Sequence, residues 1–188
     1  MMERPRVRLG ASGVRVGYAD AGMTVRPRPD LRFLFSSPAA FLALGGGAGL
    51  VPKAPGTAGS LLAIPLVLLL QLAPFAWQLA IWAALCAVGL WLCENVGRAL
   101  GEPDHGAIVW DEICGMAIVL LLAPPGLGWT LAAFLAFRLF DIVKPWPINI
   151  IDRRMPNGLG AMSDDLLAAV YAAVVIGFAE WLIEVAAP

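Results

Sequence analysis

Five long apolar runs constrain the fold of this 188-residue chain more than any other feature. They cover residues 61–72, 75–96, 108–123, 129–143 and 166–187. A helix needs about 20 apolar residues to cross a bilayer. The second and fifth runs meet this length, whereas the other three are short enough to be tilted or inserted as hairpin arms. The chain is 60% hydrophobic, against roughly half for soluble domains. We therefore predict an all-α, polytopic membrane helical bundle with short or hairpin-inserted helices.

The N-terminal segment, residues 1–36, differs from the rest of the chain in composition. It carries seven of the thirteen basic residues, namely Arg4, Arg6, Arg8, Arg15, Arg26, Arg28 and Arg32. It shows no apolar period and has no apolar core of signal-peptide length, so we expect neither cleavage nor export. We predict a disordered basic tail over residues 1–36 that lies on anionic lipid headgroups. Residues 37–188 are expected to form one membrane-embedded domain.

The charges in the connections between the runs predict an orientation. The connections at 72–76 and 124–128 contain no charged residue, whereas those at 97–107 and 144–163 carry arginine and lysine. If all five runs cross the membrane, the two basic connections share one face with the N-terminus. The positive-inside rule makes that face cytoplasmic. The expected protein is therefore multi-pass, with its charged connections in the cytoplasm.

Most acidic residues of the helical region fall on this same predicted face. They are Asp104, Asp111, Glu112, Asp141, Asp152, Asp164 and Asp165, with His105 among them. Toward the far face lie Glu180 and Glu184. Unpaired buried carboxylates are costly in a protein core and in lipid. They either cap helices and neutralise cations, or they form a divalent cation site, since hard oxygen ligands suit Mg²⁺.

Three short patterns surround these acids. Arg138, Asp141 and Lys144 recur every three residues and form one charged stripe on a helix end. The stripe is either a neutralising network or a site in which Asp141 binds a metal and the two cations bind phosphate oxygens. His105, the single histidine, is a candidate acid for a leaving alkoxide or a solvent-facing loop residue. Asp104 and Asp111 would share one helix face if a helix ran through both.

The acidic pair Asp164–Asp165 follows a glycine-containing turn and is expected to open the last helix, with one of the two as a possible cap. A second glycine-rich stretch, residues 45–60, holds six glycines and two prolines and is not expected to be regular helix. It matches neither a Walker motif nor GxGxxG. We expect a flexible turn with Thr57 or Ser60 as the cap of the following helix. That helix start either holds an anion or only makes the turn.

Four stretches together resemble a known family, in unbroken order over about residues 38–175. They are Ala54-Pro55-Gly56-Thr57 with Gly59-Ser60, Asp104-His105-Gly106 with Ile108-Val109-Trp110-Asp111-Glu112 and Gly115, Phe137-Arg138 with Asp141 and Lys144-Pro145-Trp146-Pro147-Ile148, and Gly158, Gly160, Met162 with Asp164-Asp165. The chain resembles phosphatidylglycerophosphatase A, a family of small bacterial inner-membrane lipid phosphatases. The chain departs from the family pattern at two places. Asn157-Gly158 stands where family members often have Gly-Gly, and Ala168-Ala169 stands where they often have Ala-Gly. Neither departure removes a carboxylate.

The resemblance implies Mg²⁺-dependent removal of the terminal phosphate of phosphatidylglycerol phosphate, which yields phosphatidylglycerol. The predicted metal ligands, which also carry the catalysis together with His105, are Asp111, Glu112, Asp141, Asp164 and Asp165. The predicted substrate-binding residues are Gly56, Thr57, Ser60, Arg138 and Lys144. The partners are then the lipid substrate and the surrounding membrane lipids, with no nucleic acid. The site is expected on the cytoplasmic face of the bacterial inner membrane.

A different class of protein competes with this interpretation. An ion-coupled transporter or ion-binding membrane protein also carries carboxylates in apolar segments. Such a protein is expected to hold its acids at mid-span, whereas here they stand at the ends of the apolar runs. Phosphatidic-acid-type phosphatases use two catalytic histidines, and this chain has one.

Overall fold

The computed structural model describes residues 28–102, 104–155 and 157–187, and within these ranges all regular structure is helical. The helices are α1 (Leu31–Leu34), α2 (Pro38–Ala43), the 3₁₀ helix η1 (Gly45–Leu50), α3 (Pro55–Leu70), α4 (Phe75–Leu100), α5 (Trp110–Leu122), α6 (Leu127–Val143), α7 (Ile148–Arg154) and α8 (Gly158–Ala186). The prediction of an all-α bundle is confirmed. Residues 1–27 of the predicted tail lie outside the described residues.

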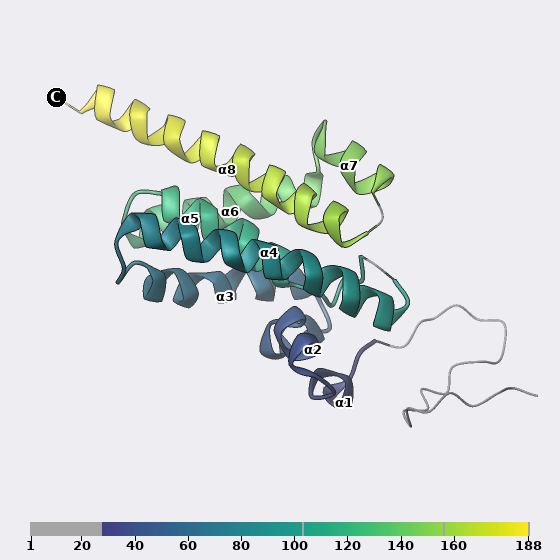
Figure 1. Ribbon diagram of the computed structural model, residues 1–188. Coiled ribbons are helices and arrows are strands. Elements are labelled where there is room, and N and C mark those ends of the chain that lie inside the picture. The colour runs from purple at the N-terminus through teal and green to yellow at the C-terminus, as the bar shows by residue number, and fades with distance from the viewer. Residues whose placement is uncertain (1–27, 103, 156, 188) are drawn as a thin grey trace, which may run out of the picture.

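The bundle is built around α5, which contacts α3, α4, α6 and α8. Almost every residue of α5 from Ile113 to Leu121 is buried. A helix that is apolar all round is expected at the centre of a bundle rather than on its surface. With 13 residues, α5 is about 20 Å long, well short of a bilayer core of about 30 Å. Figure 1 shows α1, α2 and α7 gathered at one end of the bundle, where α8 begins.

Two helices, α4 and α8, are long and apolar enough to cross a membrane. Both also lie largely on the outside, because only 22% of the most apolar window of each is buried. Large apolar side chains are exposed elsewhere on the bundle too, among them Leu72 at 84% and Leu127 at 75%. A continuous apolar exterior of this kind suits lipid rather than water. The fold is that of a membrane helical bundle.

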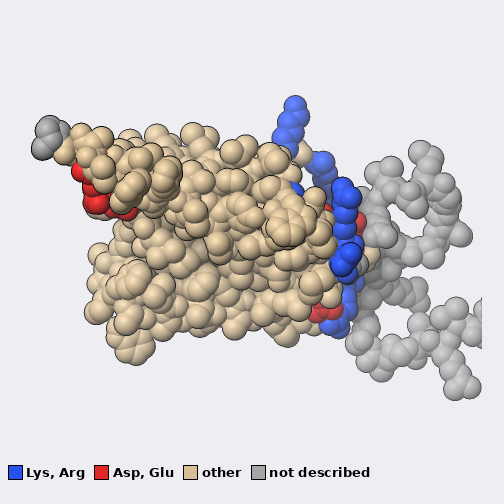
Figure 2. Space-filling view, turned by 90° about the horizontal axis from the view of Figure 1, so that it is seen from above, with Lys and Arg blue, Asp and Glu red and all other residues tan. Residues whose placement is uncertain are grey.

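Charged side chains are segregated along the long axis of the bundle. Figure 2 shows lysine and arginine in a band at one end, with some acidic side chains beside them, and further acidic side chains at the opposite end near the C-terminus. The exposed residues Arg98, Arg153 and Arg154 end α4 and α7. The position of these cations at one end agrees with the asymmetry of basic residues in the sequence. Which side of a membrane the basic end faces stays a prediction.

The glycine-rich stretch 45–60 is more helical than the sequence indicated. After η1, with Gly46 and Gly47 at positive φ, α3 already begins at Pro55. Proline suits the first turn of a helix because its missing N–H has no partner there. The expected caps are wrong. The N-cap is Ala54 without a side-chain bond, and the Ser60 hydroxyl donates to the Gly56 carbonyl inside the helix, 2.9 Å away.

The connection 144–163 also differs from the expected polar loop. It contains α7 and the first six residues of α8, whose N-cap is Asn157. Asp164 and Asp165 therefore lie in the second turn of α8 and do not cap it. Similarly, Asp104 and Asp111 are not on one continuous helix. Gly101 ends α4 in the left-handed region, at φ 78°, and α5 starts only at Trp110.

Candidate active site

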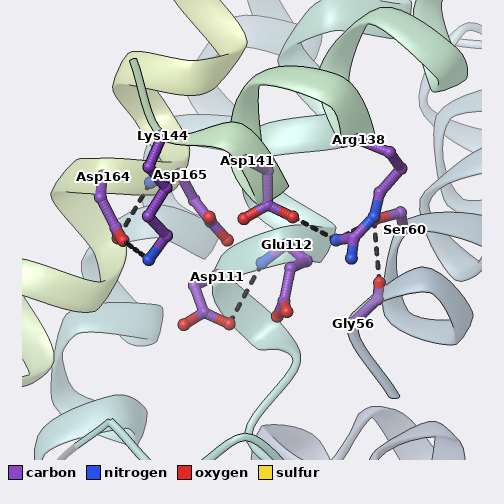
Figure 3. Close-up of polar contacts among 9 residues, drawn as sticks. All are labelled: Gly56, Ser60, Asp111, Glu112, Arg138, Asp141, Lys144, Asp164 and Asp165. Atoms are coloured by element: carbon purple, nitrogen blue, oxygen red, sulfur yellow. Dashed lines mark hydrogen bonds and ion pairs between the residues drawn. The ribbon is translucent and has the colours of Figure 1, made fainter. Parts of the chain in front are cut away.

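Three carboxylates, two of them buried and that of Glu112 half-buried, meet where α5 and α8 pack together. Asp111 and Glu112 come from the first turn of α5, and Asp165 comes from the second turn of α8. One ligand oxygen from each of the three lies within 4.8 Å of the others. Asp111 and Asp165 are only 6% and 5% exposed. Figure 3 shows the three side chains, with that of Asp141 from α6, around a common space.

This group of carboxylates fits a divalent cation. Crowded negative charges at a buried position repel one another unless a cation is bound or protons are taken up. In addition, Glu112 Oε2 is buried and has no hydrogen-bond partner. A buried carboxylate oxygen without a partner is costly, and hard oxygen ligands of this kind are those that Mg²⁺ and Ca²⁺ prefer. Asp111, Glu112 and Asp165 are therefore the residues that could hold a metal ion.

Arg138, on α6 like Asp141, lies beside this group of carboxylates. It forms an ion pair with Asp141, and the two side chains are only 13% and 11% exposed. Its Nη1 also lies 3.4 Å from the hydroxyl oxygen of Ser60 in α3. The Nε–H of Arg138 is buried without an acceptor. An arginine with an unused buried donor beside carboxylates has the chemistry to receive a phosphate oxygen.

Lys144, at the C-cap of α6, binds two carboxylates at once. Its ammonium forms ion pairs with Asp152 of α7 and Asp164 of α8, as Figure 3 shows for Asp164. Burial by itself lowers the pKa of Lys144, but the hydrogen bonds to these two carboxylates outweigh that effect and raise the pKa above its ordinary value. Lys144 thus stays charged, and Asp164 pairs with it and is not a member of the group of three carboxylates.

Gly56 places the start of α3 directly against the carboxylates. A Cβ atom on Gly56 would lie 2.1 Å from Glu112 Oε1 and 3.2 Å from Arg138 Nη1. Only glycine allows this close approach. Thr57 follows in the same turn and is half-buried. The predicted substrate-binding segment therefore borders the acidic group.

His105 lies elsewhere. It lines a cavity of about 720 Å³ together with Arg28, Pro52 and Pro55. Its Nδ1 accepts the N–H of Ala107 at 3.1 Å, so in the neutral imidazole the proton is on Nε2. Among the described residues, the histidine does not belong to the group of carboxylates that could hold a metal. Its role as an acid stays a prediction.

The structure brings together most of the residues predicted for the site. Asp111, Glu112 and Asp165 meet in one group, Asp141 and Arg138 adjoin it, and the start of α3 borders it. Asp152, the second partner of Lys144, is not among the residues predicted for the site. Asp152 follows Lys144 by eight residues, and this spacing does not predict a contact, because the contact depends on the turn between α6 and α7.

The chain matches the family model described as phosphatidylglycerophosphatase A over residues 41–180. It is 41% identical to phosphatidylglycerophosphatase A of Escherichia coli (strain K12), over 83% of this chain and 94% of the relative. It is 45% identical to phosphatidylglycerophosphatase A of Haemophilus influenzae, over 74% of this chain and 87% of the relative. A protein of Bacteroides thetaiotaomicron named putative phosphatidylinositol-3-phosphatase is 41% identical, over 74% and 91%.

No solved structure shows a significant match to this chain. The sequence matches nevertheless cover most of its length, including every carboxylate of the site. They favour an enzyme over the alternative of an ion-coupled transporter. The chain belongs to the phosphatidylglycerophosphatase A family and is a membrane-bound phosphatase that acts on a phospholipid.

Proposed function

We propose that this protein removes the terminal phosphate of phosphatidylglycerol phosphate in a Mg²⁺-dependent reaction and releases phosphatidylglycerol. The observation that carries the proposal is the group formed by Asp111, Glu112 and Asp165, whose ligand oxygens lie within 4.8 Å of one another. A phosphomonoester hydrolase needs to neutralise phosphate charge and to align an attacking oxygen.

The residues of the site divide into two tasks. Asp111, Glu112 and Asp165 would hold Mg²⁺, which when bound supplies positive charge to the phosphate oxygens. Arg138 binds the phosphate through donors that Asp141 and Ser60 hold in place.

The location of the site follows from the charge distribution. We place the basic end of the bundle, which Figure 2 shows as a band of lysine and arginine, on the cytoplasmic face of the bacterial inner membrane. The positive-inside rule supports this orientation. The phosphate of the lipid headgroup would then meet the carboxylates at the membrane surface, and the product lipid would stay in the bilayer.

The direct test is phosphate release by the purified protein in mixed micelles of phosphatidylglycerol phosphate, with Mg²⁺ or with a chelator. We expect release only with Mg²⁺. Asp165→Asn is expected to reduce it about 100-fold or more, because a metal ligand matters at least as much as the groups that orient it. Glu184→Gln, at the far exposed end of α8, serves as the matched control and should keep full activity.

A second lipid substrate tests whether the enzyme prefers one headgroup or removes phosphate from different phospholipids equally well. A phosphatidylinositol monophosphate is the appropriate choice, because one relative is named a putative phosphatidylinositol-3-phosphatase. We expect a lower kcat/KM on this lipid than on phosphatidylglycerol phosphate. Equal or faster turnover of the inositol lipid would contradict the proposed substrate, and full activity in the chelator would contradict the metal.

A further inference from the structure

Glu94, near the end of α4, makes a polar contact with the start of α8. Its Oε2 accepts the backbone N–H of Gly158 at 2.9 Å, while Oε1 accepts from Arg98 on its own helix. Gly158 is the first residue of α8, and its N–H is one of those that a helix start leaves without a partner inside the helix. Asn157 accepts a second one, from Gly160 at 2.9 Å. Two side chains, one local and one from α4, therefore cap α8.

The backbones of the two helices also touch at this point. A Cβ atom on Gly158 would lie 2.4 Å from the nitrogen of Glu94 and 2.9 Å from its Cα. One turn further along α8, Met162 fills the space above Gly89 of α4, where an added Cβ would lie 2.3 Å from Met162 Cε. The position of α8 on α4 is thus set by two close approaches and one hydrogen bond to a carboxylate.

This contact bears on the site because α8 is one continuous helix. Asp164 and Asp165 follow Gly158 by six and seven residues, which is about 10 Å along the helix axis. A slip of α8 by one residue would move its side chains by about 1.5 Å along the axis and rotate them by about 100°. Asp165 would then leave the group whose ligand atoms now lie within 4.8 Å.

We propose that Glu94 is a positioning residue that fixes the start of α8 on α4 and thereby holds Asp165 in place for metal binding. The inference rests on the proposed Mg²⁺-dependent function. The charge of Glu94 is part of the effect, because a carboxylate at a helix start interacts favourably with the helix dipole and makes a stronger hydrogen bond than an amide does. Glutamine at this position keeps the size and an acceptor but loses the charge. Alanine loses all three.

The experiment compares Glu94→Ala, Glu94→Gln and Arg98→Ala with the wild-type protein in detergent. Three quantities are measured: the Mg²⁺ concentration for half-maximal activity, the shift of Tm that Mg²⁺ produces, and amide hydrogen exchange at residues 158–161. For Glu94→Ala we expect about tenfold more Mg²⁺ for half-maximal activity, in line with the loss of one hydrogen bond to a charged group. We also expect a smaller Tm shift, faster exchange at 158–161 and an unchanged KM for the lipid.

The other two variants sharpen the test. Glu94→Gln should fall between alanine and the wild type in all three measurements. Arg98→Ala should behave like the wild type, because Arg98 is 65% exposed and exposed ion pairs contribute little. If Glu94→Ala does not fold, Glu94→Gln alone decides the question.

Two results would overturn the inference. The first is a wild-type Mg²⁺ requirement and Tm shift in Glu94→Ala, or in Glu94→Gln where alanine does not fold. The second is an equal loss in Glu94→Ala and Arg98→Ala, which would assign the effect to the ion pair on α4. A wild-type protein whose activity and Tm both ignore Mg²⁺ would refute the proposed function itself. Exchange at 158–161 in the Glu94 variants would still decide whether Glu94 fixes the start of α8.

Discussion

Glu112 is the residue on which most of the site's contacts converge. Its carboxylate lies against the Cα of Gly56 and belongs, with Asp111 and Asp165, to the group that could hold a metal ion. One of its oxygens is buried without a hydrogen-bond partner among the described residues. Its backbone N–H donates to Asp111 Oδ1 at 3.1 Å. The Glu112 carboxylate can therefore occupy its position only because Gly56 has no side chain.

Gly56→Ala is expected to lower activity by at least about tenfold while the protein still folds. The new Cβ would lie 2.1 Å from Glu112 Oε1. The glutamate, as the flexible partner, has to move away from the other carboxylates, and the metal-ligand geometry tolerates little displacement. The measurement is kcat at saturating Mg²⁺, with Tm as the check on folding. Gly177→Ala on α8, where an added Cβ meets nothing within 4 Å, is the control. Full activity in Gly56→Ala would show that Glu112 is not needed at its present position.

At the scale of the elements, Lys144 joins three helices at the site end. It ends α6, and its ammonium pairs with Asp152 of α7 and Asp164 of α8. Asp164 is 3% exposed, so its charge depends on this partner. Removal of one member of a buried pair is more damaging than removal of both, because the remaining charge is left without compensation.

Lys144→Gln is therefore expected to destabilise the protein by about 3 kcal/mol. Asp164→Asn in the same chain should recover a large part of this loss. The measurement is denaturant unfolding in detergent for the two single variants and the double variant, which form a double-mutant cycle. Additive losses would mean that the two residues do not stabilise each other. Activity is a separate readout: a loss of activity in the double variant that Asp164→Asn alone does not show would assign Lys144 a role in substrate binding as well.

At the scale of the whole molecule, the segregation of charge predicts which end faces the cytoplasm. Glu102 lies in the exposed connection after α4, and Gly128 lies at the exposed start of α6. The two residues stand at opposite ends of the long helices. The connection that contains Glu102 carries Arg98 as its one lysine or arginine, and the one before α6 carries no charge. The positive-inside rule places the first in the cytoplasm and the second outside.

Cysteine labelling in intact cells tests this orientation. The native cysteines are first replaced by alanine, and Glu102→Cys and Gly128→Cys are made singly. An added Cβ at Gly128 meets nothing within 4 Å. We expect a membrane-impermeant reagent to label position 128 but to reach position 102 only after the membrane is made permeable. Equal labelling of both positions from outside would contradict a topology in which the bundle crosses the membrane.

Sequence alone determined the class of fold and pointed to most residues of the candidate site. The length of the apolar runs required helices, because a lipid-exposed backbone has to satisfy its hydrogen bonds internally. The positions of Asp111, Glu112, Asp141, Asp164 and Asp165 at the ends of these runs indicated one acidic region. The resemblance of the motifs to a known family then identified the chemistry, and the family matches bear out that recognition.

Only the tertiary structure decided which of these residues form the group that could hold a metal and which form ion pairs. Neighbours in sequence separate, since Asp165 joins the group that could hold a metal while Asp164 binds Lys144. Asp152 and Glu94, which no motif singled out, acquire partners on other helices. The physical reason is that such contacts depend on the rotation and register of one helix against another. Those are set by close packing at Gly56, Gly89 and Gly158, and a local sequence pattern does not contain them.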